Sequence, residues 1–501
     1  MRIINATIGR RIFRGWVEHA LDGLRAAAET EATATAAAQV RGIAYSRPVI
    51  EGGTEGRAGR ALGGVVAATA VLLLATLGSA ENAGAAVYCA PSPCTGDFQM
   101  ATIEGAVTAA DGAAGADTVA IKSGTYNTPQ QGCGGLFVNG PNTTVTGAGI
   151  GETVLTFPQP DADFGGTRTV ICGHMDLQDL TLRLPSDITP GLNSNVQGID
   201  LYSGSIRRVR VDAPGAEYGP GSNDGRASGM LIRGDGTVVQ NVEVAFGLAR
   251  DSDGISTTDL PGEVKDVTVR ARNYGFTSRV SQQVGGDPMR VERLISRSRE
   301  PLQVLNETGV NSEMVLSDSL LDASGVRRAV NTHGVTVVNG QPPEAVKLTM
   351  DRVTIVGNRS DNGYAMGVFG QGQPRPTVLK ARHVIATGFR YSLLFGLFGG
   401  DAKAIIGYSN VNLSPRKIKV TGDDGDAIKR FGPRIRKGDP LFKDPEAHDF
   451  RLRSRSPAVD IGGADLVPGG PADLGGDPRP ADGDGDGVSQ NDAGAYERQP
   501  H

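Results

Sequence analysis

A short apolar pattern recurs along the middle of this 501-residue chain and limits the folds that the sequence can adopt. It consists of an apolar residue, two polar residues, a second apolar residue, one further residue and a third apolar residue. The last two apolar places alternate as in a β-strand, whereas the polar step before them interrupts the alternation like a corner. A repeat of this kind predicts a solenoid whose rungs bury their apolar faces by stacking. The copies start at Leu177, Ile206, Val239, Val264, Val291, Leu316, Met350, Ala381 and Tyr408.

The third place of this pattern is expected to form a tight bend. Asn or Asp stands there in five of nine copies, and these residues tolerate a left-handed backbone best. A second strand precedes each corner in six repeats, which align without insertions at residues 198–202, 229–233, 254–258, 275–279, 301–305 and 329–333. Each rung is therefore predicted to carry three short strands, which gives an all-β parallel β-helix over residues 86–437. A helical solenoid is the rival, but the valine-rich runs of period two argue against it.

Composition agrees with many short strands joined by turns. The chain holds 71 glycines against 14 phenylalanines, 10 tyrosines and one tryptophan. Its formal net charge of −5 leaves no dominant basic surface to neutralise phosphates, so no nucleic-acid partner is expected.

Both ends of the solenoid are expected to differ from its middle. Residues 98–110 place Ile103, Ala106 and Val107 on one face, which predicts a short N-terminal capping helix. From residue 438 the repeat stops, and proline, aspartate and glycine become frequent. Residues 438–501 are therefore predicted to form an irregular C-terminal cap with an Asp-rich loop.

Residues 61–80 form an uncharged apolar run that is preceded by two arginines and followed by small residues. This arrangement predicts a signal peptide over residues 61–85, a mature N-terminus near Ala86 and a secreted or cell-surface protein. The run is also long enough to span a bilayer, so an uncleaved anchor is the alternative and the only membrane association expected. Residues 1–60 are either a disordered leader or precede the true start of the protein.

All four cysteines, Cys89, Cys94, Cys133 and Cys172, follow the proposed cleavage point, which favours disulfides in an oxidising compartment. Cys89 and Cys94 enclose a turn-prone loop that could bring them together, and Cys133 and Cys172 could meet across neighbouring coils. Four cysteines allow three pairings, and the spacing does not choose among them. Free thiols that pack as small apolar residues are the other alternative, since no zinc-like spacing is present.

Several segments resemble known families. ADTVAIKSGTY at residues 116–126, TTVTGAGIGETVL at residues 143–155 and the rungs after them resemble bacterial pectin-lyase-like right-handed β-helix proteins over about residues 97–437. The tail resembles that of choice-of-anchor Q β-helix proteins through DPLFKDPEAHDFRLRSRSPAVDIG, DLGGDPRPADGDGDG and DAGAYE, in this order. The resemblance implies a right-handed parallel β-helix. In that family the tail commonly precedes a surface anchor, whereas this chain ends in Arg-Gln-Pro-His, so secretion without such an anchor is expected.

The tail also contains a candidate calcium loop. Aspartates stand at its places one, three and five, glycine at place six permits a sharp turn, and the carbonyl at place seven adds an oxygen. Place twelve is Ala493, where an EF-hand has a bidentate glutamate, so Asp492 or Glu497 could complete the shell. A bound Ca²⁺ would stiffen the C-terminal cap, and a solvated acidic loop is the alternative. The predicted ligands are Asp482, Asp484, Asp486, the carbonyl of Val488 and Asp492.

In pectin-lyase-like proteins the substrate lies along one parallel sheet, which directs attention to the outward side chains of the strands that begin with glycine. Adjacent rungs lie about 4.8 Å apart, so arginines two rungs apart would stand roughly 10 Å from each other and could hold the carboxylates of an acidic glycan. Polar side chains on the exposed face of any soluble solenoid are the alternative. The groove candidates are Asp200, Tyr202, Arg233, Arg279, Asn331 and His333.

Catalytic residues are not evident. Asp251 and Asp253 resemble the first acidic motif of polygalacturonases, but the later motifs of that family are missing from suitable positions. Arg233, Arg279 or His333 could supply the base of a lyase. We expect a monomer that engages polysaccharide along the sheet face in a binding or structural role. A polysaccharide lyase or glycoside hydrolase acting on an acidic glycan is the alternative, and calcium is the only cofactor expected.

Overall fold

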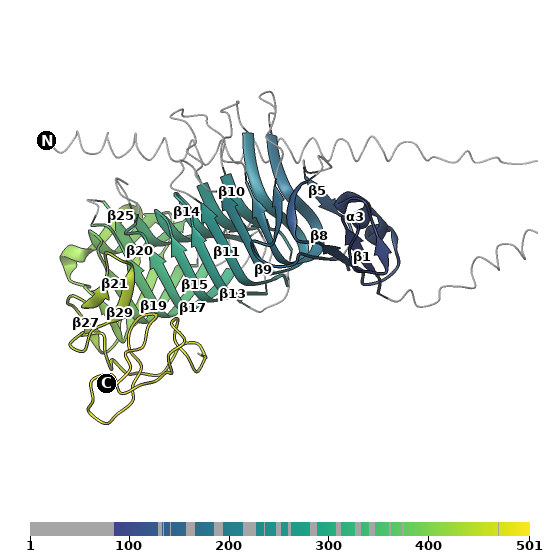
Figure 1. Ribbon diagram of the computed structural model, residues 1–501. Coiled ribbons are helices and arrows are strands. Elements are labelled where there is room, and N and C mark those ends of the chain that lie inside the picture. The colour runs from purple at the N-terminus through teal and green to yellow at the C-terminus, as the bar shows by residue number, and fades with distance from the viewer. Residues whose placement is uncertain are drawn as a thin grey trace, which may run out of the picture. The chain divides into compact units, whose positions relative to one another are not determined.

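The strands of this chain pair in parallel with the strands one rung before and one rung after them. In the computed structural model, every described strand except β28 and β29 belongs to one sheet that winds as a right-handed parallel β-helix (Figure 1). The structure describes residues 85–128, 133, 135–140, 142–156, 166–184, 194–213, 227–234, 236–246, 252–258, 262–280, 288–306, 312–325, 332–339, 346–359, 362–372, 375–468 and 470–500. Residues 1–84, with the predicted leader and most of the predicted signal peptide, lie outside it. No helix in the described ranges is long and apolar enough to cross a membrane.

The rungs stack their strands in three files. The first file contains β5 (Leu136–Val138), β10 (Ala227–Ile232), β12 (Ser252–Thr257), β14 (Tyr274–Val280), β16 (Glu300–Asn306), β18 (His333–Asn339), β20 (Tyr364–Gln371), β22 (Tyr391–Phe398) and β25 (Ile418–Asp424). Strands β8 (Gly166–Arg183) and β9 (Ser194–Ala213) run through all three files. We call the outward side of the first file the front face.

The second file contains β1 (Val87–Ala90), β3 (Thr118–Ile121), β6 (Thr144–Thr146), β11 (Val238–Phe246), β13 (Glu263–Arg270), β15 (Met289–Arg297), β17 (Ser312–Asp322), β19 (Val346–Val356), β21 (Thr377–Thr387), β23 (Ala402–Gly407) and β26 (Ala427–Phe431). Several of these strands continue past the corner into the third file, which also contains β4 (Gly124–Asn127), β7 (Thr153–Thr156), β24 (Ser409–Val411) and β27 (Ile435–Arg436). A 3₁₀ turn at Pro415–Lys417 precedes β25.

A left-handed backbone recurs at the third place of the corner pattern, as predicted. Arginine and histidine adopt it as well as Asn and Asp, so the stacked geometry overrides the local preference. The ninth copy begins two residues earlier than predicted, because Ala381 pairs with Ile406, and its left-handed residue is Tyr408. We call this stack the turn column, and it consists of Asp179, Arg208, Asn241, Asp266, Arg293, Asp318, Arg352, His383 and Tyr408, with φ between 47° and 59°.

Five of the six predicted first strands pair in the predicted register. Their inward residues Ile199, Met230, Ile255, Phe276 and Leu302 are paired in succession and buried. The sixth prediction was wrong by five residues, because Leu302 pairs with Val335. The prediction began this strand within the connection before β18, which is longer than the connections before β12, β14 and β16.

The glycine that opens many first strands marks a break in the strand alternation. A Cβ on Gly254 would overlap Val269 Cγ1, and one on Gly275 would overlap Ser296 Oγ, both in the third file. The glycine and the apolar residue after it therefore both face the interior. As a consequence, the side chain before the glycine turns outward, which strict alternation does not predict.

The N-terminal end is closed as the sequence predicts. Helix α3 (Ile103–Gly112) buries Ile103, Ala106, Val107 and Ala110 against the first rungs, and the Thr102 side chain accepts the N–H of Gly105 at its start (Figure 1). The short strand β2 (Phe98–Gln99) pairs with β1 before this helix. Two disulfides, Cys89–Cys94 and Cys133–Cys172, join the four cysteines in this region.

The C-terminal segment, residues 438–500, lies along the flank of the later rungs. Its hairpin of β28 (Phe442–Asp444) and β29 (Asp449–Leu452) and the loops after it contribute to a second apolar cluster. This cluster includes Leu320, Val356 and Ile385, which stand on β17, β19 and β21. Figure 1 shows these yellow loops below β17 and β19.

Candidate functional site

The predicted groove residues Asp200, Tyr202 and Arg233 lie together on the front face. The guanidinium of Arg233 donates to both carboxylate oxygens of Asp200, at 2.7 and 3.0 Å. It also lies 5.8 Å from the centroid of the Tyr202 ring, and His174 meets that ring edge-on at 5.5 Å. His174 Nδ1 is in turn 2.8 Å from Ser203 Oγ. This end of the face therefore offers a cation, two rings and a carboxylate within one connected group.

The remaining groove candidates divide into three cases. Arg279 is exposed on β14, and register places it two rungs beyond Arg233. Asn331 lies outside the described residues. His333 does not continue the column of Arg233 and Arg279, because Arg279 pairs with Leu305 and Leu305 with Val338.

His333 belongs instead to the outward file that precedes the glycines. It stacks on Tyr364 with ring centroids 4.0 Å apart and an interplanar angle of 12°, and its Nδ1 lies 3.5 Å from Glu300 Oε2. Gln303, an outward residue of β16, donates to Glu300 Oε1 at 3.5 Å, a long contact. These contacts place Glu300, His333 and Tyr364 on the front face, although alternation counted from the core residues predicts them inside.

The glycine in β20 makes room for this arrangement. A Cβ on Gly367 would overlap the rings of Tyr364 and Phe369, so the tyrosine lies across the outward side of its own strand. Its hydroxyl is 3.0 Å from Thr336 Oγ1 on the neighbouring strand. Burial raises the pKa of Tyr364 well above its usual value, and the Glu300 carboxylate acts in the same direction. Tyr364 is therefore a neutral hydrogen-bonding ring at physiological pH.

In this group His333 is more exposed than Glu300. The imidazole is 26 % exposed beside a Glu300 side chain that is only 5 % exposed. A nearly buried carboxylate next to a reachable imidazole can orient the ring toward a bound molecule. The arrangement can therefore exchange a proton with a bound molecule.

The same file continues to a cationic end at β22. Tyr391 pairs with Tyr364 and is partly exposed. Arg390 Cζ lies 5.9 Å and Lys419 Nζ 5.2 Å from the centroid of the Tyr391 ring. Sequence reasoning missed this end because its alignment of first strands stopped at residues 329–333, before β20 and β22.

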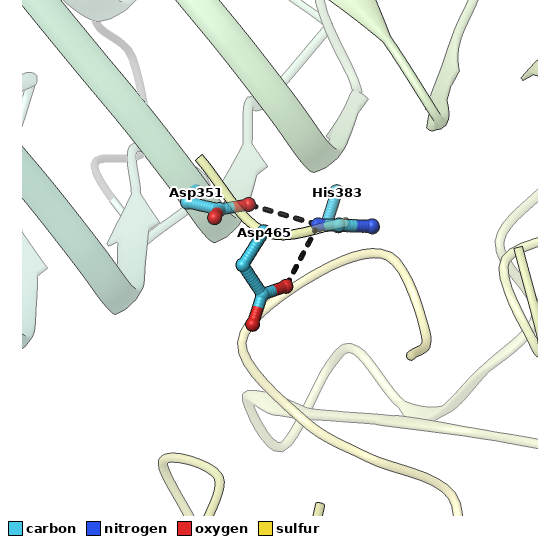
Figure 2. Close-up of side chains that lie close together, drawn as sticks. All are labelled: Asp351, His383 and Asp465. Carbon is cyan, nitrogen blue, oxygen red and sulfur yellow. Dashed lines mark hydrogen bonds and ion pairs between the residues drawn. The ribbon is translucent and has the colours of Figure 1, made fainter. Parts of the chain in front are cut away.

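A cluster beside the turn column joins the buried Asp351 and His383 to the exposed Asp465 (Figure 2). His383 Nδ1 lies 2.8 Å from Asp351 Oδ1, and its Nε2 lies 2.9 Å from the carbonyl oxygen of Gly462. Both ring nitrogens thus face acceptors, and the Nε2 contact reaches the C-terminal segment. His383 and its two aspartates therefore join the C-terminal segment to the turn column.

The neighbouring Arg352 also contacts the C-terminal segment, through Asp465 and the carbonyl oxygen of Val467. Its fully buried side chain binds Asp318 at 2.7 Å, Asp351 at 3.0 Å and Asp465 at 3.2 Å. Burial acts to lower the pKa of Arg352, but these carboxylates outweigh it and raise the pKa. The Arg352 guanidinium is therefore ion-paired entirely with carboxylates of the fold.

The Asp-rich loop has a different arrangement from the predicted one. Carboxylate oxygens of Asp460, Asp482 and Asp484 lie within 4.8 Å of one another, and Asp460 comes from outside the loop. Asp486 Oδ1 accepts the N–H of Val488 at 2.8 Å. Asp492 is buried and accepts the N–H groups of Asp460 and Arg498, at 2.7 Å each. The side chains of the predicted ligands Asp486 and Asp492 are not in this converging set, and the carbonyl of Val488 stays a predicted ligand.

Comparison with known proteins finds three solved structures that match this chain at low identity. No protein-family model and no curated protein matches the chain. The A-module of mannuronan C-5 epimerase AlgE4 from Azotobacter vinelandii is 16% identical, with 67% of this chain and 91% of that chain covered and a TM-score of 0.38. The AlgE6 A-module from the same organism is 13% identical, covers 67% of this chain and 95% of that chain, and has a TM-score of 0.27.

The third structure is the catalytic domain of a GH87 alpha-1,3-glucanase. It is 14% identical, with 70% of this chain and 64% of that chain covered, and its TM-score is 0.33. At this identity the superpositions transfer no residue role to the present chain.

Proposed function

We propose that the chain binds an acidic polysaccharide along its front face. The observation that carries this proposal is the outward file of Tyr274, Glu300, His333, Tyr364 and Tyr391, which ends between Arg390 and Lys419. Within it the partly exposed rings of Tyr274, His333 and Tyr391 occupy every second rung. Their strands are therefore about 10 Å apart, a regular spacing suited to an extended chain molecule.

The chemistry of this file suits a uronic-acid polymer. Aromatic and imidazole rings offer flat apolar surface to the faces of sugar rings, and their polar edges can bond hydroxyl groups. Ammonium and guanidinium groups beside such a ring attract carboxylates through charge-assisted hydrogen bonds. Tyr391 with Arg390 and Lys419 combines both features at one point.

Binding is tested by calorimetry with the full chain. Polygalacturonate and alginate are compared with the neutral polymer dextran, and Tyr391→Ala and Lys419→Ala with the wild type. Each variant is expected to weaken polyuronate binding about tenfold, since hydrogen bonds to charged groups contribute about 1.5–3 kcal/mol. The matched control is Lys429→Ala, an exposed lysine on β26 in the second file. Equal affinities of Lys419→Ala and Lys429→Ala, or no binding to either polyuronate, would reject the proposal.

A second candidate function is cleavage of the bound polymer, which the pairing of His333 with Glu300 supports. In β-elimination a base removes the proton beside the sugar carboxylate, the glycosidic bond breaks, and the departing oxygen takes up a proton. An unsaturated sugar end remains. His333 is placed for proton transfer because its ring is reachable and its partner carboxylate is nearly buried.

This activity is measured by the absorbance of unsaturated ends with the same two polyuronates. His333→Ala is expected to reduce the rate by at least about 100-fold, a much larger loss than the roughly tenfold weakening of binding expected for a single ring of this file. His174→Ala is the matched control, because this histidine lies on the same face but contacts Ser203 rather than a carboxylate. If the wild type produces no unsaturated ends, the front face only binds.

We further propose that the protein works outside the cytoplasm. The two disulfides support an oxidising compartment. Membership in the choice-of-anchor Q and pectin-lyase-like families, signal cleavage and a monomeric state remain predictions from the sequence.

A further inference from the structure

We propose that Asp460, Asp482 and Asp484 hold one calcium ion, which ties two distant stretches of the C-terminal segment together. Their carboxylate oxygens come within 4.8 Å of one another. Three oxygen donors with negative charge at such separations match the ligand preference of a hard divalent cation. The site combines one buried, one half-buried and one exposed aspartate, so an ion could enter from solvent.

The buried member of the set has an unused oxygen. Asp460 is 5 % exposed, and among the described residues no group donates a hydrogen bond to its Oδ1. Its other oxygen accepts the N–H of Asp484 at 2.7 Å, which fixes the carboxylate beside the loop. A buried carboxylate oxygen without a donor is unfavourable, and a cation shared with two further carboxylates would satisfy it.

The loop is shaped around Asp482 by its own backbone. The N–H groups of Gly485, Asp486 and Gly487 donate to the Asp482 carboxylate at 2.8 to 3.1 Å. Gly485 and Gly487 have φ of 82° and 89°, which a residue with a side chain rarely adopts. Arg498 contacts the carbonyl oxygen of Gly483, so that oxygen is already used. The loop therefore presents Asp482 and Asp484 toward Asp460 without further rearrangement.

This ligand set differs from a linear loop of aspartates at every second position. The Asp486 and Asp492 carboxylates are not part of the set whose oxygens lie within 4.8 Å of one another, and Asp492 instead accepts the N–H groups of Asp460 and Arg498. Asp492 thus supports the site by holding the Asp460 main chain. The two arrangements make opposite predictions for Asp486 and Asp460.

The ion would also stabilise the docking of the tail. The two residues after Asp460 provide carbonyl groups to the helix body, since Ile461 accepts from Arg434 at 2.9 Å and Gly462 faces His383. Fixing Asp460 against the loop therefore restrains the stretch that meets the turn column. Binding to the folded state alone raises the unfolding temperature as the ion concentration rises.

The test uses the full chain after treatment with EDTA, titrated with CaCl₂ and separately with MgCl₂ by calorimetry, with thermal unfolding followed by circular dichroism. One equivalent of calcium is expected to bind and to raise the Tm, with weaker binding of magnesium. Asp460→Asn should lower calcium affinity at least about tenfold, because ligand charge sets affinity in such sites. Without calcium its Tm should not fall below that of the wild type, since one of three converging charges has been removed.

Asp486→Asn is the matched control and should bind calcium within about threefold of the wild type, because this carboxylate lies outside the converging set. If Asp460→Asn fails to fold, Asp484→Asn replaces it, because this exposed carboxylate is expected to be needed for the ion but not for folding. The proposal is overturned if calcium produces neither heat nor a rise in Tm. It is also overturned if Asp486→Asn weakens binding as much as the substitution of Asp460 or Asp484.

Discussion

The front face and the turn column are built by the same rungs but differ in how far their charged side chains are exposed to solvent. On the turn column, Arg352 is fully buried between three aspartates and is covered by the C-terminal segment. On the front face, Arg233 binds Asp200 with comparable geometry, yet its side chain is 46% exposed. A buried ion pair holds the fold together only while both partners remain, whereas an exposed pair contributes little to stability. The flank is thus specialised for holding the tail, and the front face presents charges to solvent and ligands.

The largest effect on stability is expected from removing the buried ion pairs of the turn column. Arg352→Met removes the cation while preserving most of the side-chain volume, and leaves Asp318 and Asp351 as buried charges. We expect a loss of about 3–5 kcal/mol in the free energy of unfolding, measured by urea denaturation. The C-terminal segment should also become sensitive to proteolysis. Wild-type stability in this variant would show that the tail docks mainly through its apolar cluster.

A smaller loss is expected where the glycines turn the chain at the start of the first strands. Gly254→Ala places a Cβ against Val269 Cγ1 and the carbonyl of Gly275, and overpacking of this kind costs about 1–3 kcal/mol. The matched control is Gly112→Ala at the end of α3, where a Cβ meets nothing within 4 Å. The control should be neutral or stabilise by up to about 1 kcal/mol. Equal effects of both substitutions in thermal unfolding would contradict the inward placement of Gly254.

The stability that the C-terminal segment contributes is also expected to depend on pH. Burial and then the neighbouring Glu497 carboxylate raise the pKa of Asp492 to about 8, and burial raises the pKa of Glu497. Unfolded carboxyl groups lose their protons near about pH 4, so above this pH the native state binds more protons than the unfolded state. The contribution of this pair to stability therefore declines as pH rises from about 4 to 8.

Glu497→Gln is expected to flatten this decline, because Asp492 then no longer faces a second carboxylate. Urea midpoints at pH 5 and pH 8 measure the slope, with the exposed Glu446→Gln as control. A slope identical to that of the wild type would show that the pair does not take up a proton on folding.

The sequence predicted the parts of this fold that repeat. The corner pattern identified eight of the nine left-handed positions, and five first strands lay in the predicted register. Errors appeared where a rung departs from its neighbours, at the long connection before β18 and at the shifted corner of Tyr408. His333 was named as a surface candidate from an alignment five residues out of register, and its partners Glu300 and Tyr364 were missed.

The position in which the C-terminal segment packs could not be predicted from the repeat pattern of the sequence. Arg352 meets Asp465 and Val467 across more than 100 residues, and no periodicity links these positions. The same is true of Asp460, which joins the Asp-rich loop from 22 residues before Asp482. In both cases a residue of the C-terminal segment adds a ligand or ion-pair partner that lies far away in the sequence. Such contacts depend on where an irregular segment packs, which repeats do not specify.

The smallest effect on stability is expected from removing the exposed ion pair of the front face. Arg233→Met removes a cation from a partly exposed pair with Asp200, and should change the free energy of unfolding by less than about 1 kcal/mol. Its binding effect should be larger than its effect on stability, because the guanidinium and the Tyr202 ring lie on the face that we propose to hold the glycan. Urea denaturation and polyuronate titration of the same preparation measure both quantities. A loss of stability approaching that of Arg352→Met would mean that the front face, too, is structural, and the distinction between the two regions would fail.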